Sequence, residues 1–172
     1  IGVKADSNGG VKFNSGVRYS QWAINSRLHD FYANTTHFGL ATYNADGTKS
    51  KERIDSKNKL DYVPGLVAKS MIEAADYYQD FDWSKPWFLS VKEYGDAYSN
   101  SVPNGGGSLD DLNAVKLYIG LYNNTNATEK SNYKTAISRA QTGLVAHNKS
   151  YSIPSGTLAG DAVVGGWFHK TA

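Results

Sequence analysis

Two adjacent carboxylates, Asp110 and Asp111, are the residues of this chain best suited to chemistry. They follow three glycines and Ser108, a residue type that caps helices well, and they open a segment, residues 109–122, whose side chains are mostly apolar. A helix without a polar face is expected to be buried, so residues 109–122 should run through the interior with one polar end open to a site. Carboxyl groups at such an opening suit general acid–base catalysis.

The two carboxylates differ in how well a structural role explains them. Asp111 stands three positions after Ser108, as in a capping box with Asp in place of Glu, so capping of the helix accounts for it well. The side chain of Asp110 points about 100° away around the helix and cannot cap in the same way. Asp110 is therefore the stronger candidate for a functional role.

The composition is that of an ordinary globular protein with many aromatic residues. The chain has 172 residues, a net charge of +2 and no Cys. These values argue against a nucleic-acid binder and exclude disulfides and thiol catalysis. No apolar run approaches the roughly 18 residues of a membrane span. The 12 Tyr, 4 Trp and 6 Phe offer flat faces that suit sugar rings, although core packing accounts for most of them.

Motifs that hold cofactors or activate nucleophiles are missing from the sequence. No His, Asp and Glu residues have the spacing of metal ligands, and there is no Gly-x-Ser-x-Gly. The glycines at 105–107 lack the Lys and Ser/Thr of a phosphate loop. We therefore predict no cofactor and no metal.

Apolar stripes at helical spacing predict an all-α fold. The four predicted helices are residues 61–78, 87–100, 109–122 and 129–147. They form two hairpins that begin about 45–50 residues apart, a spacing typical of stacked helix pairs. A closed toroid of helix pairs or a solenoid would satisfy this pattern.

The rest of the chain frames these hairpins within one predicted domain. Residues 1–59 are a loop-rich entry with one helix within 17–33, a short strand within 36–43 and a turn at 44–47. Residues 60–150 hold the two hairpins. Residues 151–172 are expected to form a loop or extended tail.

Four segments, taken in order, resemble the unsaturated uronyl hydrolases, which include the unsaturated glucuronyl and rhamnogalacturonyl hydrolases. The segments are 60–69 (LDYVPGLVAK), 83–88 (WSKPWF), 109–116 (LDDLNAVK) and 165–170 (GGWFHK). Their order and spacing match across residues 61–170, and the glycan-degrading bacterial branch of the family is the most similar.

The resemblance implies an (α/α)6 toroid with a central pocket. The implied substrate is an acidic oligosaccharide from a polysaccharide lyase, with a 4,5-unsaturated uronic acid at its non-reducing end. A carboxylic acid protonates C4, water adds at C5, and the resulting hemiketal opens and releases the sugar. Asp110 matches the catalytic aspartate in the family's Leu-Asp-x-hydrophobic-Asn context.

The resemblance also implies residues that contact the substrate. Trp167 and His169 match a Trp-x-His segment that lines the pocket. Asp111 and Trp87 are further candidates for contact with the sugar, with core packing as the alternative for Trp87. Three arginines could meet the uronate carboxylate, and the sequence does not choose among them. They are Arg18, Arg27 and Arg53.

One part of the family pattern is missing. The second aspartate, usually the principal acid/base, belongs to a Trp-hydrophobic-Asp-Gly motif that this sequence lacks. Six helix pairs of about 45 residues need roughly 270 residues. We therefore expect the chain to supply about half of a toroid, to miss the C-terminal half of its domain, and to have no hydrolase activity alone.

A protein of another class is the alternative interpretation. In a helical-repeat glycan-binding or scaffold protein, aromatic side chains would bind the glycan and Asp110 would only cap its helix. We expect no nucleic-acid partner and no membrane span in either case. Because the sequence starts with Ile1 rather than Met, a periplasmic or secreted protein is favoured over a cytoplasmic one.

Overall fold

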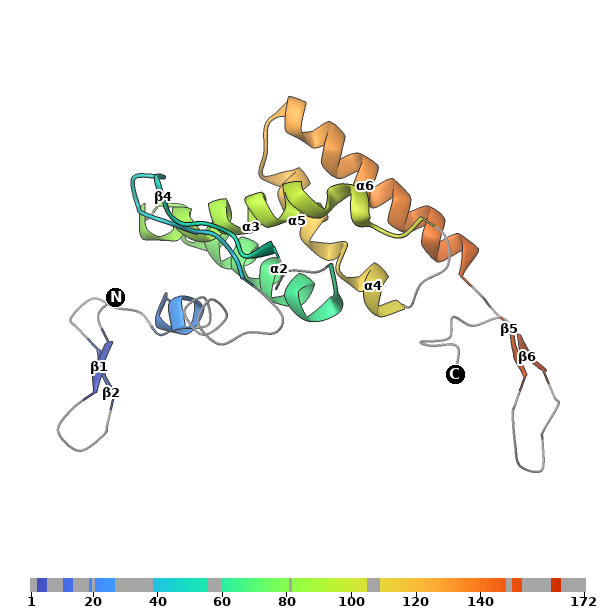
Figure 1. Ribbon diagram of the computed structural model, residues 1–172, viewed down its shortest axis with the longest axis horizontal. Coiled ribbons are helices and arrows are strands. Elements are labelled where there is room, and N and C mark those ends of the chain that lie inside the picture. The colour runs from blue at the N-terminus through green and yellow to red at the C-terminus, as the bar shows by residue number, and fades with distance from the viewer. Residues whose placement is uncertain are drawn as a thin grey trace. The chain divides into compact units, whose positions relative to one another are not determined.

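The part of the chain that the structure describes is mainly helical, which confirms the all-α prediction. The computed structural model describes residues 3–5, 11–13, 19, 21–26, 39–55, 60–80, 82–104, 109–147, 150–152 and 162–164. The helices, shown in Figure 1, are α2 (Tyr62–Tyr77), α3 (Lys85–Tyr98), α4 (Leu109–Asn113), α5 (Lys116–Asn123) and α6 (Ala127–Ala146). Two short 3₁₀ turns, η2 (Asp82–Ser84) and η3 (Ser99–Ser101), flank α3.

The strands are short and pair locally. Each of three antiparallel hairpins has two strands. They are β1 (Val3–Ala5) with β2 (Val11–Phe13), β3 (Thr42–Tyr43) with β4 (Lys49–Lys51), and β5 (Ser150–Ser152) with β6 (Ala162–Val164). Parts of the predicted loop-rich entry and of the predicted tail therefore form hairpins. Residues 21–26, within the helix predicted at 17–33, are helical.

Contacts divide the chain into two compact units. One unit consists of Ile1–Lys59 and Ser70–Tyr94, and the other consists of Leu60–Lys69 and Gly95–Ala172. Helices α2 and α3 thus each contribute one part to each unit. The core of the first unit is made by Leu40, Ala41, Met71, Ile72, Ala75, Trp87, Val91 and Tyr94. The core of the second is made by Ala68, Val102, Ala114, Val115, Leu117, Tyr118, Leu121, Tyr133 and Ala136.

Three of the four predicted helices are confirmed almost to their ends. The predictions at 61–78 and 87–100 correspond to α2 and α3, and the prediction at 129–147 corresponds to α6. Helix α6 begins two residues earlier than expected because Asn126 caps it. The Asn126 side-chain oxygen accepts hydrogen bonds from the backbone N–H groups of Thr128 at 3.1 Å and Glu129 at 3.2 Å.

The prediction of one continuous helix over residues 109–122 is wrong. The chain forms two helices, α4 and α5, separated at Ala114 and Val115. There the backbone changes to i→i−3 hydrogen bonds, such as Tyr118 N–H to Val115 O at 2.9 Å. The segment is also not buried on all sides, since 51% of Ile119 is exposed while Leu117 and Leu121 are fully buried.

In the first unit, the β3–β4 hairpin turns where the sequence predicted. Gly47 has a positive φ of 87°, a conformation that favours glycine, and its N–H donates to Asn44 O at 2.9 Å. The Asp46 carboxylate accepts from the backbone N–H of Thr48 at 2.8 Å. Figure 1 shows this hairpin running along α3.

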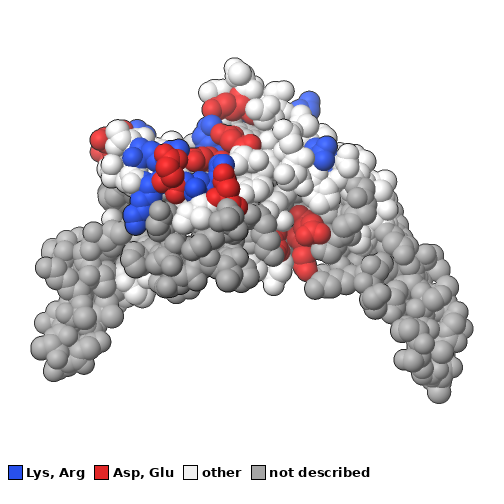
Figure 2. Space-filling model, in the orientation of Figure 1, with Lys and Arg blue, Asp and Glu red and all other residues white. Residues whose placement is uncertain are grey.

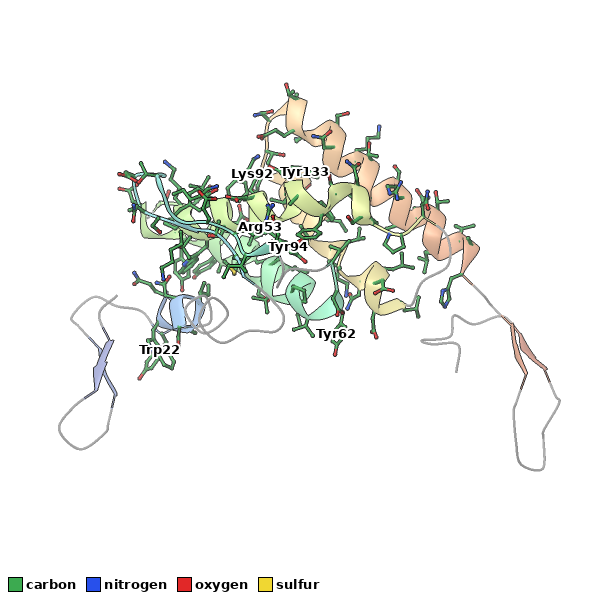
Figure 3. The ribbon with its side chains drawn as sticks, viewed as in Figure 1. Trp22, Arg53, Tyr62, Lys92, Tyr94 and Tyr133 are labelled. Atoms are coloured by element: carbon green, nitrogen blue, oxygen red, sulfur yellow. The ribbon has the colours of Figure 1, made fainter. Side chains whose placement is uncertain are left out.

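A set of polar contacts, which we call the Glu93 cluster, joins this hairpin to α3. The Tyr43 hydroxyl donates to Glu93 Oε2 in a short hydrogen bond. Lys49 Nζ lies 3.0 Å from the same oxygen, and Arg53 Nη1 donates to the Glu93 backbone carbonyl at 3.2 Å. Figure 2 shows acidic and basic side chains interleaved in this region, and Figure 3 labels Arg53 beside α3. Glu93 thus joins α3 to the hairpin through both its carboxylate and its backbone carbonyl.

Replacing Glu93 with Ala should loosen the hairpin and change the titration of Tyr43. Burial, and then the hydrogen bond to Glu93, raise the pKa of Tyr43 to about 12. In the variant this pKa should fall part of the way back toward 10, and loss of a hydrogen bond to a charged group should lower the free energy of unfolding by about 2 kcal/mol. Alkaline ultraviolet titration and urea unfolding measure these two effects.

Glu52→Ala is the matched control for Glu93→Ala. Glu52 contacts the same lysine, with its carboxylate 3.1 Å from Lys49 Nζ, but 82% of its side chain is exposed. We expect no measurable change in the urea midpoint for this variant. Equal effects of the two substitutions would contradict the central place of Glu93 in the cluster.

In the second unit, α6 packs against α5, α4 and η3. The segments predicted at 109–122 and 129–147 are therefore in contact with each other. The Tyr118 hydroxyl donates to Gly95 O at 2.9 Å, and the Tyr133 hydroxyl donates to Asp96 Oδ1 at 2.6 Å. The two rings lie 6.1 Å apart between centroids. Phenol groups from α5 and α6 therefore both anchor on the C-terminal part of α3.

Tyr133→Phe should destabilise the protein at neutral pH and lose this effect at high pH. Burial, and then the hydrogen bond to Asp96, raise the pKa of Tyr133. The folded state therefore holds the phenol proton more firmly than the unfolded state, whose pKa is about 10. The stabilisation is complete below that pH and is lost as pH rises above it. We expect the variant to be about 1 kcal/mol less stable at pH 7, and the difference to vanish by about pH 11.

Urea unfolding of wild type and Tyr133→Phe at both pH values measures the effect of Tyr133. Tyr77→Phe is the control, because 80% of Tyr77 is exposed, and it should match the wild type at neutral pH. A stability difference for Tyr133→Phe that stays constant from neutral to alkaline pH would refute the assigned role of the phenol proton.

Among the described residues, no helix has both the length and the apolar character required to cross a membrane.

Candidate functional site

The predicted catalytic residue Asp110 and its neighbour Asp111 lie on the first turn of α4. Both residues are half-buried, so their carboxylates are neither enclosed in the core nor fully in water. Figure 2 shows an acidic patch at the place where Figure 1 draws α4. A half-buried carboxyl group can hydrogen-bond a ligand and exchange a proton with it.

The structure packs α4 closely at its C-terminal end. Gly65 of α2 meets Ala114 there so closely that a Cβ built on Gly65 would lie 2.5 Å from the Ala114 Cα. Real Cβ atoms do not approach other atoms to that distance. The backbone of α2 therefore touches the residue that directly follows α4, and only glycine at position 65 allows this contact.

A second close contact holds α4 from α6. A Cβ built on Gly143 would lie 3.0 Å from Leu112 Cδ2 and 2.9 Å from the backbone oxygen of Pro103. One helical turn earlier on α6, Arg139 Nε donates to the Val102 carbonyl at 2.8 Å. Helix α6 thus contacts both α4 and the segment that precedes the glycine loop.

Trp87, a predicted contact for the sugar, lies in the core of the first unit. None of its surface is exposed, and its indole Nε1 donates to Asn25 Oδ1 at 3.1 Å. With no exposed face, the indole ring cannot stack on a sugar ring. The substrate-binding expectation for Trp87 is thus corrected in favour of core packing.

Several predicted residues fall outside the described part of the chain. These are the glycine loop at 105–107, Ser108, Trp167, His169, Arg18 and Arg27. Their predictions are untested. Arg53 is described, and its guanidinium contacts Asp55 Oδ1 and the Glu93 carbonyl within the Glu93 cluster. Its polar contacts within the protein give Arg53 a structural role and make it a weaker candidate for a uronate carboxylate.

Two features of the structure were not anticipated from the sequence. Gly65 and Gly143 lie inside amphipathic helical stripes, and an isolated glycine in a helical pattern is a signal of close packing that could have been used. The Glu93 cluster brings together residues about 40 to 50 positions apart in the sequence, and no local sequence pattern predicts such a contact.

The predicted site residues Asp110 and Asp111 offer the chemistry of carboxyl groups. Within the described ranges, no three His, Asp or Glu side chains gather in a way that could hold a metal ion. Asp110 and Asp111 can accept hydrogen bonds from sugar hydroxyls, and in the protonated form either can donate a proton. These two residues are therefore the candidate site.

Comparison with known proteins gives no match. No protein-family model matches the chain, and neither the curated proteins nor the solved structures include a significantly similar one.

Proposed function

We propose that this chain belongs to a glycoside hydrolase of the unsaturated uronyl hydrolase type. The observation that carries the proposal is the Leu-Asp-Asp-Leu-Asn motif, whose first aspartate, Asp110, is half-buried at the start of a short, tightly packed helix. The resemblance in four ordered segments supports it, and so does the all-α fold. We further propose that the helical hairpins form part of an (α/α)6 toroid.

The proposed substrate is an acidic oligosaccharide with a 4,5-unsaturated uronic acid at its non-reducing end. In the proposed reaction, a carboxylic acid adds a proton to C4 and a water oxygen bonds to C5. The water gives up a proton to a carboxylate, and the bond between C5 and the ring oxygen breaks to leave a ketone at C5 and a hemiacetal at C1. The hemiacetal then becomes an aldehyde as its bond to the remaining sugar breaks. Asp110 is proposed as one of the carboxyl groups in this proton transfer.

Other residues are proposed to bind the sugar rather than to transfer protons. Asp111 would accept a hydrogen bond from a sugar hydroxyl, since a carboxylate accepts such bonds strongly. Trp167 would offer an apolar face to a sugar ring, and His169 would hydrogen-bond at the same place.

A direct assay tests the proposed function. The complete gene product is incubated with unsaturated glucuronyl and rhamnogalacturonyl disaccharides, and loss of the ultraviolet absorbance of the enol ether is followed. We expect turnover of at least one unsaturated disaccharide and none of the saturated counterparts. Binding without consumption of any unsaturated disaccharide would overturn the proposal and support a glycan-binding protein.

A further inference from the structure

We propose that Gly65 and Gly143 are positioning residues for Asp110, and that Gly65 contributes the larger effect. The inference rests on the proposed function, because it concerns how the proposed catalytic carboxylate is held. Its basis is the packing of α4, which has only five residues. A single turn of helix is unstable alone, so the contacts around α4 must determine its position.

The backbone conformation of these two glycines does not explain their presence. Among the described residues, Gly47 is the glycine with a positive φ, so Gly65 and Gly143 have conformations that alanine could adopt. Glycine also weakens the interior of a helix relative to alanine. The reason for glycine at both positions is therefore the close approach of a neighbouring element.

The approach at Gly65 is the stricter of the two. A Cβ there would lie 2.5 Å from the Cα and 3.0 Å from the Cβ of Ala114. A backbone atom cannot turn aside as the end of a side chain can. Ordinary contact begins at 3.4 Å, so adding a methyl group must move α4 and α2 apart by roughly 1 Å. Asp110 lies one helical turn before Ala114 and would move with α4.

The approach at Gly143 holds the same helix from another side. There a Cβ would meet the Leu112 side chain at 3.0 Å and the Pro103 backbone oxygen at 2.9 Å. The shortest distance there is 2.9 Å, against 2.5 Å at Gly65, so the expected displacement is smaller. Together with the Arg139 hydrogen bond to Val102, this contact places α6 against Pro103 and against Leu112 of α4.

Gly65→Ala, made in the complete gene product, tests the proposal. Misplacement of a catalytic group by about 1 Å can cost about 100-fold in rate. We therefore expect kcat on the unsaturated disaccharide to fall by about 100-fold with KM changed less than about threefold. Gly143→Ala should show the same pattern with a smaller loss.

Gly95→Ala is the matched control. A Cβ on Gly95 would also come within 2.5 Å of another atom, but that atom is Leu121 Cδ1, the end of a side chain on α5. Gly95→Ala adds a methyl group to the core of the same unit without displacing α4. We therefore expect this variant to keep a wild-type kcat. Circular dichroism establishes that each variant is folded, and hydrogen exchange should be faster in residues 109–113 for Gly65→Ala but not for Gly95→Ala.

The outcomes separate the two proposals. A wild type that turns over no unsaturated disaccharide would refute the proposed function. An active wild type and a folded Gly65→Ala variant with unchanged kcat would refute the positioning role alone. If Gly65→Ala fails to fold, the milder Gly143→Ala is the test. A wild-type kcat in Gly143→Ala would overturn the inference. A loss of kcat in Gly95→Ala equal to that in Gly143→Ala would also overturn it.

Discussion

In the complete gene product, Asp110→Asn should reduce kcat on an unsaturated disaccharide by about 10²- to 10⁴-fold, the range that general acid–base groups contribute. The amide keeps the size and the hydrogen-bonding oxygen of the carboxylate but cannot supply or take up the proton. Because Asp110 is half-buried on the first turn of α4, the free energy of unfolding should change by less than about 1 kcal/mol. Initial rates and urea unfolding measure the two quantities.

The control for Asp110→Asn is the same exchange at an exposed carboxylate on a helix. Asp76 on α2 is exposed, and Asp76→Asn should leave kcat and KM at their wild-type values. Substantial activity in Asp110→Asn, within about tenfold of wild type, would remove Asp110 from the proton-transfer step. Glycan binding by the inactive variant should persist, because the change acts on proton transfer.

Trp87→Ala should lower the free energy of unfolding by about 3–5 kcal/mol, the usual cost of removing a fully buried aromatic side chain. The indole has no exposed surface and fills the core of the first unit, and its Nε1 hydrogen bond to Asn25 would also be lost. A change of this size is a large part of the stability of a small protein. Urea unfolding followed by circular dichroism measures it.

Two milder variants separate the contributions at Trp87. Asn25→Ala removes only the hydrogen bond and should cost about 1 kcal/mol, whereas Trp87→Phe removes the hydrogen bond and part of the packing. If Trp87→Ala unfolds at the wild-type urea concentration and only weakens sugar binding, the indole would be a stacking surface rather than part of the core.

The parts of the fold that sequence predicted are those with a local cause. The apolar stripe of α2, with Pro64 in its first turn, and the stripe of α6 are periodic patterns that predict a helix without knowledge of what packs against it. The turn at Gly47 likewise follows from a short run of Asn, Asp and Gly. Each of these signals is contained within a few residues.

The parts that sequence missed have distant causes. Residues 109–122 are apolar enough for one helix, but the helix is interrupted at Ala114, where the backbone meets Gly65 of α2. The burial of Trp87 likewise depends on the chain around it, including Asn25. For the candidate site, the sequence singled out Asp110 and Asp111 from their local pattern, but not the two glycines that hold their helix.

The contact between Gly65 and Ala114 limits how the two positions can vary. The space between the two backbones is smaller than a methyl group, so substitution at position 65 is tolerated only if α4 moves. A replacement of Ala114 by a bulkier residue meets the same barrier from the other side. Homologous sequences are therefore expected to retain small residues at both positions. Where one position has changed, we expect the other to have changed with it, and α4 to lie in a different place.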